Sequence, residues 1–279
     1  MRVLNNKPVY MKDKRVLYVS SEVIPYLPET EISSMSFEAP RMVNSNDGQI
    51  RIFMPRYGNI NERRHQLHEV IRLSGMNLVI NDLDMPLIIK VASIPKERMQ
   101  VYFIDNDDYF KRKATYADED GNLFPDNDER AIFFAKGVIE TVKKLNWSPD
   151  IIHVHGWLAS FLPLYLRTYY NNEPLFENSK IVTSLYNPGF QGTLNTKLID
   201  KIKFDGIEEA TISHLKNPNY FNVMKTAMDN SDAVIVGSNE ISEEFQEYLK
   251  NLDKPVLNFH KMEEFSEAYL DFYQSKVLV

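Results

Sequence analysis

The sequence predicts an α/β fold in which a doubly wound parallel sheet carries an inserted antiparallel segment. The first observation is that short β-branched runs alternate with helix-length amphipathic stretches through residues 129–249, the pattern of parallel strands joined by helices. The second is that four extended runs follow one another within residues 69–104 and leave no helix-length gap between them. Such close spacing favours antiparallel pairing inside the α/β scheme.

The first half of the chain begins with one strand-helix-strand unit. Residues 15–20 (RVLYVS) are a short β-branched run, typical of a strand buried on both faces. Residues 33–44 are weakly helical, and a turn at Gly48 leads into a second strand over residues 49–54. The four extended runs that come next are residues 69–73, 76–80, 87–92 and 99–104.

In the second half, strands and helices alternate. Apolar residues recur at helical spacing over residues 129–145, and Asp126 or Asp128 can cap the start of this helix. The elements predicted after it are a strand over 150–155, a helix over 158–170, a strand over 180–185, a helix over 217–229, a strand over 233–237, a helix over 240–249, a strand over 255–258 and a helix over 262–273.

Length and composition set the class of protein. We expect one domain over residues 12–279, with the antiparallel insertion at about 65–104 and a closing strand and helix within 255–275. The net charge of −7, from 39 acidic and 32 basic residues, argues against nucleic acid as a partner. No apolar run reaches the roughly 18 residues of a membrane span, so no membrane association and a cytoplasmic location are expected. The absence of cysteine excludes disulfides, thiolate metal sites and a cysteine nucleophile.

Two histidines mark the end of the strand predicted over residues 150–155. His153 and His155 are two positions apart and therefore share one face of the strand, and ligands bind at the carboxyl edge of parallel sheets. The alternative is that either residue is a core histidine bonded to a neighbouring backbone group. His155 at the strand tip is the stronger functional candidate. Neither H-x-x-E-H nor H-E-x-x-H occurs, so no metal site is expected.

Two further stretches carry polar candidates. Asp126 to Arg130 (DNDER) precedes the helix over 129–145, where carboxylates favour the positive helix end, but capping gives no reason for Asn127 and Arg130. The loop YNPGFQG, which begins at Tyr186, combines amides with aromatic rings that can stack on the C–H faces of a sugar. This loop suits a polyhydroxylated ligand, although a plain Pro-Gly turn is the alternative.

The turn after the first strand lacks the glycines of a phosphate-binding loop. Pro28 obstructs close approach of the backbone, and Glu29 and Glu31 repel an anion. No nucleotide cofactor is expected at this point. The chain has no G-x-S-x-G sequence, so a serine hydrolase is weakly supported.

Several stretches match motifs in the order and spacing of one family. They are Glu22-Val23-Ile24-Pro25-Tyr26, Ile50 to Tyr57, Val101 to Asp105, the D-N-x-x-R of Asp126, Asn127 and Arg130, Pro149 to Trp157 (PDIIHVHGW), and Asn187 with Phe190, Gln191 and Gly192. In these stretches the chain, to about Leu249, resembles the N-terminal domain of bacterial glycogen synthase and plant starch synthase, glycosyltransferase family 5. The resemblance implies one Rossmann-like half of a GT-B architecture.

The resemblance also implies an activity and a set of site residues. The family reaction is retaining transfer of glucose from ADP-glucose to the 4-hydroxyl of an α-glucan. By resemblance, His155 contacts the transferred sugar and Asp126 lies on the acceptor side, both as catalytic residues. The substrate-binding residues implied are Asn127, Arg130, Trp157, Tyr186, Asn187 and Gln191.

The departures from the family pattern point to impaired donor binding. Pro28-Glu29-Thr30-Glu31-Ile32 stands where the family has K-x-G-G-L, which holds the phosphates of the nucleotide sugar. Tyr186 and Leu158 replace histidines, and Gly156 replaces an aspartate. We expect no counterpart of the family's second Rossmann-like domain, which by resemblance carries most contacts to ADP-glucose.

Two hypotheses about function follow from these observations. In the first, the chain is a synthase-type domain that is incomplete or inactive alone, binds an α-glucan or oligosaccharide, and needs a second chain for turnover. In the second, it is a non-catalytic carbohydrate-binding, regulatory or scaffold protein whose exposed cleft face binds a second protein chain or another copy of itself. An NAD enzyme is disfavoured, because no G-x-G-x-x-G occurs.

Overall fold

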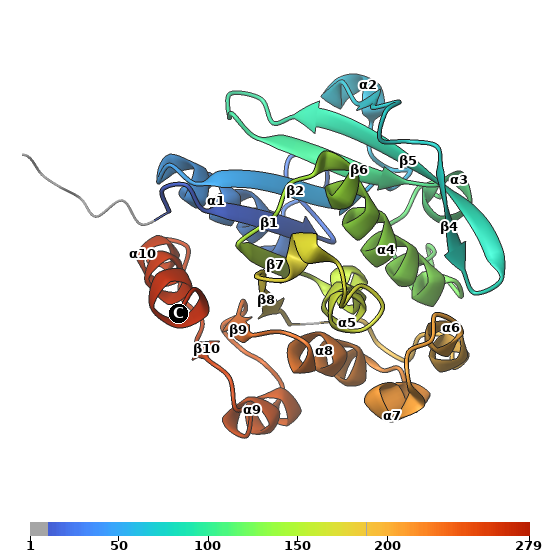
Figure 1. Cartoon of the computed structure of the whole chain (residues 1–279). Helices are drawn as coiled ribbons and strands as arrows, with labels where there is room; N and C mark the ends of the chain where they lie inside the picture. Colours follow the sequence, from blue (N-terminus) through green and yellow to red (C-terminus); the bar gives the residue numbers. More distant parts are fainter. Residues whose placement is uncertain (1–10, 188) are drawn as a thin grey trace, which may run out of the picture.

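The computed structural model describes residues 11–187 and 189–279, which form one mixed sheet flanked by helices (Figure 1). The strands are β1 (Arg15–Ser20), β2 (Gln49–Pro55), β3 (His68–Glu69), β4 (Met76–Ile80), β5 (Leu83–Ser93), β6 (Gln100–Asp105), β7 (Ile151–His155), β8 (Lys180–Leu185), β9 (Ala233–Val236) and β10 (Val256–Leu257). The α-helices are α1 (Glu31–Ser45), α2 (Glu62–His65), α3 (Asp107–Phe110), α4 (Asn127–Leu145), α5 (Phe161–Arg167), α6 (Leu198–Phe204), α7 (Glu209–Ile212), α8 (Tyr220–Asp229), α9 (Glu243–Lys250) and α10 (Phe265–Phe272).

The strand order confirms the predicted doubly wound α/β fold. It runs β10-β9-β8-β7-β1-β2-β6-β5-β3, with β4 paired to β5. The pairs from β10 to β6 are parallel, and β5 pairs antiparallel with β3, β4 and β6. The chain builds outward from β1 through β2 to β6 and then returns to place β7 on the other side of β1. The direction of winding therefore reverses between β1 and β7, and ligands of open α/β sheets bind at the carboxyl ends of the strands at such a point.

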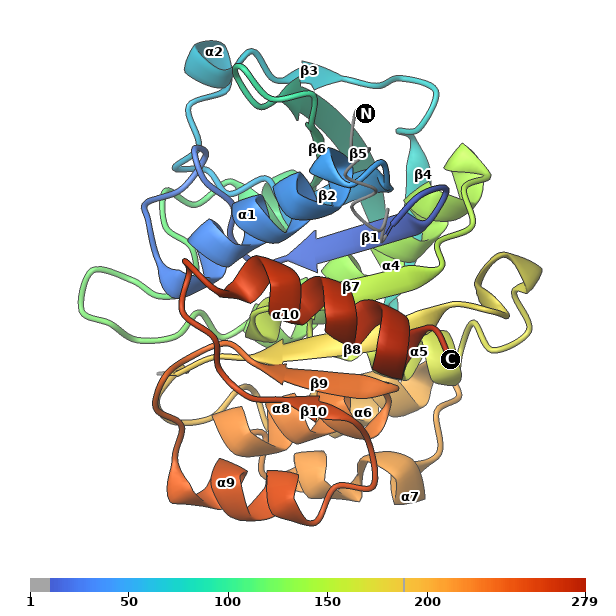
Figure 2. The ribbon, with the colours of Figure 1, turned by 90° about the vertical axis from the view of Figure 1, so that its left-hand side faces the viewer.

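Helices cover both faces of the sheet. Helices α1 and α10 lie on one face, and α4, α5 and α8 lie on the other (Figures 1 and 2). The central strands are buried on both faces, as predicted for β1; in β7 every residue is buried, including the two histidines. A π-helical turn, Tyr273–Val277, continues α10 and buries Tyr273 against the sheet.

The antiparallel part differs from the prediction in two respects. The strand predicted over residues 69–73 is wrong, because β3 ends at Glu69 and the chain turns at once, with the Leu73 amide donating to the Val70 carbonyl at 2.9 Å and Ile71 exposed. The run at 99–104 is strand β6, which pairs antiparallel with β5 but also parallel with β2. The antiparallel strands of the insertion are therefore β3, β4 and β5.

Several helix boundaries also differ. The helix predicted over residues 158–170 is a 3-10 turn, Trp157–Ala159, followed by α5, which ends at Arg167. Helices α8 and α9 each begin three residues later than predicted, because the side chains of Asn219 and Ser242 cap them. Helices α2, α3, α6 and α7 were not predicted: α2 and α3 are only four residues long, and residues 193–216 carry no clear periodicity. No helix in the described part of the chain is long and apolar enough to cross a membrane.

Candidate functional site

A cavity of about 370 Å³ lies at the carboxyl ends of the central strands. The segment after β1 contributes Glu22, the turn after β7 contributes Trp157, and the loop after β8 contributes Gln191. The described residues that line it are Glu22, Ile32, Tyr116, Ala117, Gly121, Leu123, Trp157, Gly189, Phe190, Gln191 and Tyr220. No lysine or arginine is among them, so the lining offers no cation to a phosphate.

Aromatic rings form much of the cavity lining. The ring centroid of Trp157 lies 5.0 Å from that of Tyr116 and 5.0 Å from that of Phe190. Phe190 in turn meets Tyr220 edge-on at 5.5 Å, and the Tyr220 hydroxyl donates to the Tyr186 carbonyl at 2.5 Å. A Cβ at Gly189 would overlap the Tyr220 ring. The contacts hold the rings in place, and such rings suit the C–H faces of a sugar.

Glu22 is the charged group of the cavity. Its carboxylate accepts one hydrogen bond from the Tyr116 hydroxyl at 3.0 Å and another from the Thr30 hydroxyl at 2.7 Å. Burial, together with the nearby Tyr57 and Glu22, raises the pKa of Tyr116 well above its ordinary value. Tyr116 therefore stays protonated and donates to Glu22.

Side chains of the protein itself form hydrogen bonds at the start of α1. Thr30 is its N-cap and accepts a hydrogen bond from the Ser33 amide at 3.0 Å, and the Ser33 hydroxyl accepts from the Thr30 amide at 2.8 Å in a capping box. Glu31, the first helical residue, accepts a hydrogen bond from Ser238 after β9. These contacts occupy part of the helix terminus that would otherwise be open to an anion.

His155 is fully buried and is not among the residues that line the cavity. Its Nδ1 lies 2.7 Å from the Tyr186 hydroxyl, and its Nε2 has no hydrogen-bond partner among the described residues. Burial lowers the pKa of His155 to about 3. The imidazole is therefore neutral near pH 7.

His153 is a buried core histidine, but its partners are side-chain hydroxyls and not the backbone groups that the core alternative named. Its Nδ1 lies 2.6 Å from the Tyr273 hydroxyl and its Nε2 lies 2.8 Å from the Ser184 hydroxyl, so both ring nitrogens are bonded. Its ring centroid is 4.0 Å from that of His155, as expected for two residues on one strand face. His153 thus joins the sheet interior to the C-terminal helical segment.

The three residues of the D-N-x-x-R stretch lie beside the cavity rather than in its lining. Asp126 does not cap α4 with its side chain, and that prediction is wrong; both of its oxygens instead accept from Arg112 at 2.8 and 2.5 Å. Asn127 donates to the Tyr116 carbonyl at 2.8 Å and accepts from Arg130 at 2.6 Å. The motif therefore supports the loop that presents Tyr116.

Asp128 likewise forms an ion pair instead of the predicted cap. Its carboxylate accepts from Lys201 at 2.6 Å. Arg130 is fully buried, its guanidinium lies 5.1 Å from the centroid of Phe110 and 5.5 Å from that of Phe124, and burial lowers its pKa. Both charged groups therefore lie inside the protein at the start of α4 and not in the cavity.

The loop after β8 is divided between interior and cavity. Tyr186 is buried. Asn187 is exposed, and its backbone N–H donates to the Ser238 hydroxyl at 2.9 Å. Gln191 is exposed and lines the cavity. Pro188 lies outside the described residues. Of the predicted site residues, the structure thus places Trp157 and Gln191 in the cavity lining.

The residues that the sequence analysis did not predict for the lining include Glu22, Tyr116 and Tyr220. Glu22 was matched to a motif but was given no role, and Tyr116 lies in a polar loop without a recognisable pattern. Tyr220 lies at the start of α8, which is distant in sequence from the other lining residues. The only available signal was the clustering of aromatic residues near predicted loops. Among the described residues, no three His, Asp or Glu side chains are grouped as a metal site would require.

Comparison with known proteins gives consistent matches. A family model described as the starch synthase catalytic domain matches residues 15–256. The glycogen synthase of Chlorobium luteolum is 35% identical over 228 residues, which cover 81% of this chain and 46% of that protein. The glycogen synthase of Chlorobaculum tepidum is 32% identical over 255 residues, covering 88% of this chain and 49% of that protein.

A solved structure shares the fold. The catalytic domain of starch synthase IV from Arabidopsis thaliana, bound to ADP and acarbose, superposes with a TM-score of 0.72 at 17% identity, covering 89% of this chain and 51% of that one. This chain spans about half the length of the curated relatives it matches.

Proposed function

The chain belongs to the starch synthase catalytic domain family, glycosyltransferase family 5, and from this premise we propose that its residues bind an α-glucan in the cavity at the ends of β1, β7 and β8. The observation that carries the proposal is the wall of Trp157, Phe190 and Tyr220 beside the amide of Gln191. Aromatic faces with a group that both donates and accepts hydrogen bonds suit a neutral polyhydroxylated ligand.

We further propose that this chain does not transfer glucose from ADP-glucose by itself. A departing diphosphate needs cations or N–H donors in fixed positions. The described lining of the cavity has no lysine or arginine, Glu22 is its charged group, and Glu31 stands at the start of α1. Residues 28–32 also lack the lysine and glycines of the K-x-G-G-L motif, so the donor phosphates meet carboxylates where the family supplies positive charge.

Turnover would then require a nucleotide-binding unit supplied in addition to these residues. In such an assembly we propose that His155 contacts the transferred sugar and Asp126 lies on the acceptor side, as the family resemblance implies; both would have to become accessible, since neither lines the cavity in this structure. The neutral imidazole of His155 can act as a hydrogen-bond donor or acceptor but not as a cation, because its pKa is lowered to about 3. Asn127 and Arg130 would support the site through the loop that carries Tyr116.

Calorimetry with the purified chain tests binding. Maltoheptaose is expected to bind, and ADP-glucose is expected to give no saturable heat. Gln191→Ala removes an exposed cavity amide and should weaken maltoheptaose binding several-fold, whereas Asn172→Ala, at an exposed amide outside the cavity lining, should bind like the wild type. Absence of maltoheptaose binding, or equal affinity of both variants, would reject the glucan proposal.

A separate assay tests turnover. The chain is incubated with ADP-glucose and glycogen, and release of ADP is followed over time. No release is expected from the chain alone. Steady release of ADP with incorporation of glucose into glycogen would overturn the proposal that donor binding is lost, while leaving glucan binding intact.

A further inference from the structure

Tyr186 packs on His155 at the carboxyl end of β7. The Tyr186 hydroxyl lies 2.7 Å from His155 Nδ1, and the ring centroids of the two residues are 6.0 Å apart. Both side chains are buried. Two other rings beside His155, those of Tyr18 and His153, belong to strands β1 and β7. Of these three neighbours, Tyr186 is the one that a loop supplies.

Hydrogen bonds on two sides hold Tyr186 in this position. Its carbonyl accepts from the Tyr220 hydroxyl at 2.5 Å. The next residue, Asn187, donates its backbone N–H to Ser238 Oγ at 2.9 Å, and the Ser238 hydroxyl donates to the Glu31 carboxylate. The segment is thus attached to the start of α8, to the turn after β9 and to the start of α1.

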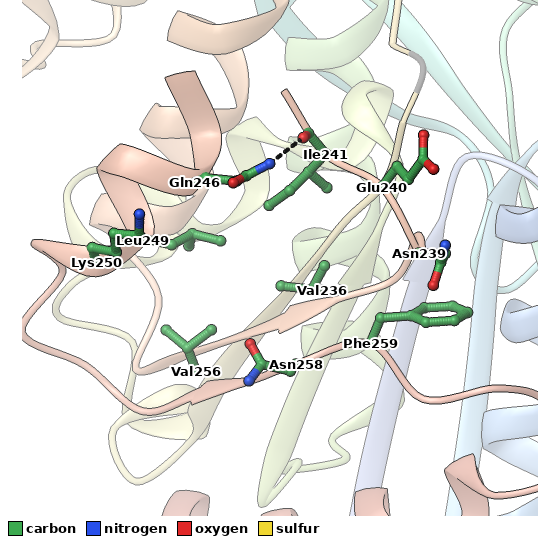
Figure 3. A pocket seen from close by; sticks show the side chains of 10 residues that line it. All are labelled: Val236, Asn239, Glu240, Ile241, Gln246, Leu249, Lys250, Val256, Asn258 and Phe259. Atoms are coloured by element: carbon green, nitrogen blue, oxygen red, sulfur yellow. Dashed lines mark hydrogen bonds between the residues drawn. The ribbon is translucent and has the colours of Figure 1, made fainter. Parts of the chain in front are cut away.

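The turn after β9 leaves room for the Tyr186 ring. A Cβ at Gly237 would overlap that ring. The residues on either side of this turn, Val236 and Asn239, line a separate cavity of about 830 Å³ (Figure 3). Neither Tyr186 nor His155 is among the described residues that line this cavity or the one of about 370 Å³. Neither cavity therefore exposes the imidazole.

His155 has hydrogen-bonding capacity that the described part of the protein does not use. Its Nε2 atom has no partner among the described residues, although buried polar atoms are usually hydrogen-bonded. Its Nδ1 atom is bonded to a phenol hydroxyl, which can donate and accept hydrogen bonds as a sugar hydroxyl does. Tyr186 therefore presents to His155 the same kind of group that a sugar would present.

We propose that Tyr186 is a specificity-determining residue: its side chain fills the space in which a sugar would meet His155, so that a glucan bound at Trp157 and Gln191 does not reach the imidazole. The inference rests on the proposed glucan-binding function and goes beyond it, because it names the residue that separates the glucan from His155. It also gives a reason for inactivity that is independent of the donor phosphates. A shorter side chain at position 186 should open this space.

Modification of histidine by diethyl pyrocarbonate, located by peptide mass spectrometry, tests the inference. At pH 6 the His155 imidazole is neutral, because burial lowers its pKa to about 3, so a slow reaction reports lack of access and not protonation. His155 should react at least tenfold faster in Tyr186→Ala and Tyr186→His than in the wild type or in Tyr186→Phe, which keeps the ring. The exposed His68 should react alike in all four proteins.

Two controls distinguish opening of this space from a loosened core. Tyr170 is also buried, in the connection from α5 to β8, and Tyr170→Ala should leave His155 unreactive. His153, which has both ring nitrogens bonded, should stay unreactive in every variant. The inference is overturned if His155 reacts fast in the wild type, stays unreactive in both Tyr186→Ala and Tyr186→His, reacts only together with His153, or reacts equally in Tyr170→Ala.

Protection by a sugar tests the specificity itself. Methyl α-glucoside should slow the reaction of His155 in Tyr186→Ala saturably and at least threefold, whereas glycerol at the same concentration should not. No protection, in a chain whose wild type binds maltoheptaose, overturns this inference and leaves the proposed function intact. Absence of maltoheptaose binding in the wild type rejects the proposed function, and the modification pattern still decides whether Tyr186 covers His155.

Discussion

The Nδ1 atom of His155 and the hydroxyl of Tyr186 lie 2.7 Å apart in the interior of the sheet. Both residues are buried, and the pKa of His155 is lowered by burial to about 3. The Tyr186 hydroxyl is held protonated, because burial raises its pKa well above the ordinary value. The pair is thus a neutral hydrogen bond that links β7 to the loop after β8, and it positions the segment that leads into the cavity.

Stability should decrease in weak acid because of His155. The folded-state pKa of about 3 lies below the unfolded value of roughly 6.5, so between these values only the unfolded chain takes up the proton. The free energy of unfolding is therefore complete above about pH 6.5 and falls below it, by up to about 1.4 kcal/mol per pH unit for this residue. Urea unfolding at pH 7 and pH 5.5 should show a smaller fall for His155→Gln than for the wild type.

Tyr186→Phe is the control for this titration. It keeps the imidazole but leaves Nδ1 without its partner, so we expect a loss of about 1–3 kcal/mol at pH 7 with the wild-type pH dependence retained. If wild type and His155→Gln lost stability equally between pH 7 and pH 5.5, His155 would not be the group that titrates.

The N-cap of α1 should contribute measurably to stability. Thr30→Ala removes the acceptor for the Ser33 amide and a donor to Glu22, and is expected to lower the free energy of unfolding by about 0.5–2 kcal/mol. Thr30→Ser keeps the hydroxyl and should lie close to the wild type. Chemical denaturation of the three proteins measures the difference, and equal midpoints for the alanine and serine variants would show that the cap is dispensable.

Gly156 should not accept a side chain. Its φ of 80° and ψ of 155° lie in a region that is essentially restricted to glycine, and a Cβ there would overlap the Ser21 side chain. Gly156→Ala is therefore expected to cost about 1–3 kcal/mol. Adding Ser21→Gly removes the overlap but not the backbone strain, so only part of the loss should return. Full recovery in the double variant, measured by urea unfolding, would show that φ is not the constraint.

The sequence predicted part of the candidate site. Trp157 and Gln191 come after strands that are recognisable in the sequence, so their place at the carboxyl edge of the sheet could be expected. Tyr116 and Tyr220 could not, because they reach the cavity through a loop and a helix start whose course depends on tertiary contacts. Asp126 was also mispredicted because of a tertiary contact. Its position at the start of α4 suggested a helix cap, but both of its carboxylate oxygens accept hydrogen bonds from Arg112.

The fold was more predictable than the site because hydrophobic periodicity reports burial directly. Strands β1, β7 and β8 are rich in apolar and β-branched residues and were located within one residue of their ends. The partners of β6 were not readable, since the same apolar run serves a parallel neighbour, β2, and an antiparallel one, β5. Periodicity tells that a strand is buried but not which strand lies beside it.

The buried ion pair of Lys136 and Asp205 provides the largest predicted loss of stability. Lys136 Nζ lies 2.7 Å from the Asp205 carboxylate, which also accepts from the Tyr165 hydroxyl at 2.6 Å, and both charged side chains are about 5% exposed or less. Lys136→Met leaves a buried carboxylate without its cation and is expected to cost about 3–5 kcal/mol. Lys225→Met removes a lysine from a more exposed pair with Asp229 and should cost at most about 1 kcal/mol. Because the penalty arises from the unpaired charge, Lys136→Met combined with Asp205→Leu should recover much of the loss in urea unfolding. Equal losses in the two single lysine variants would show that burial does not determine the strength of this pair.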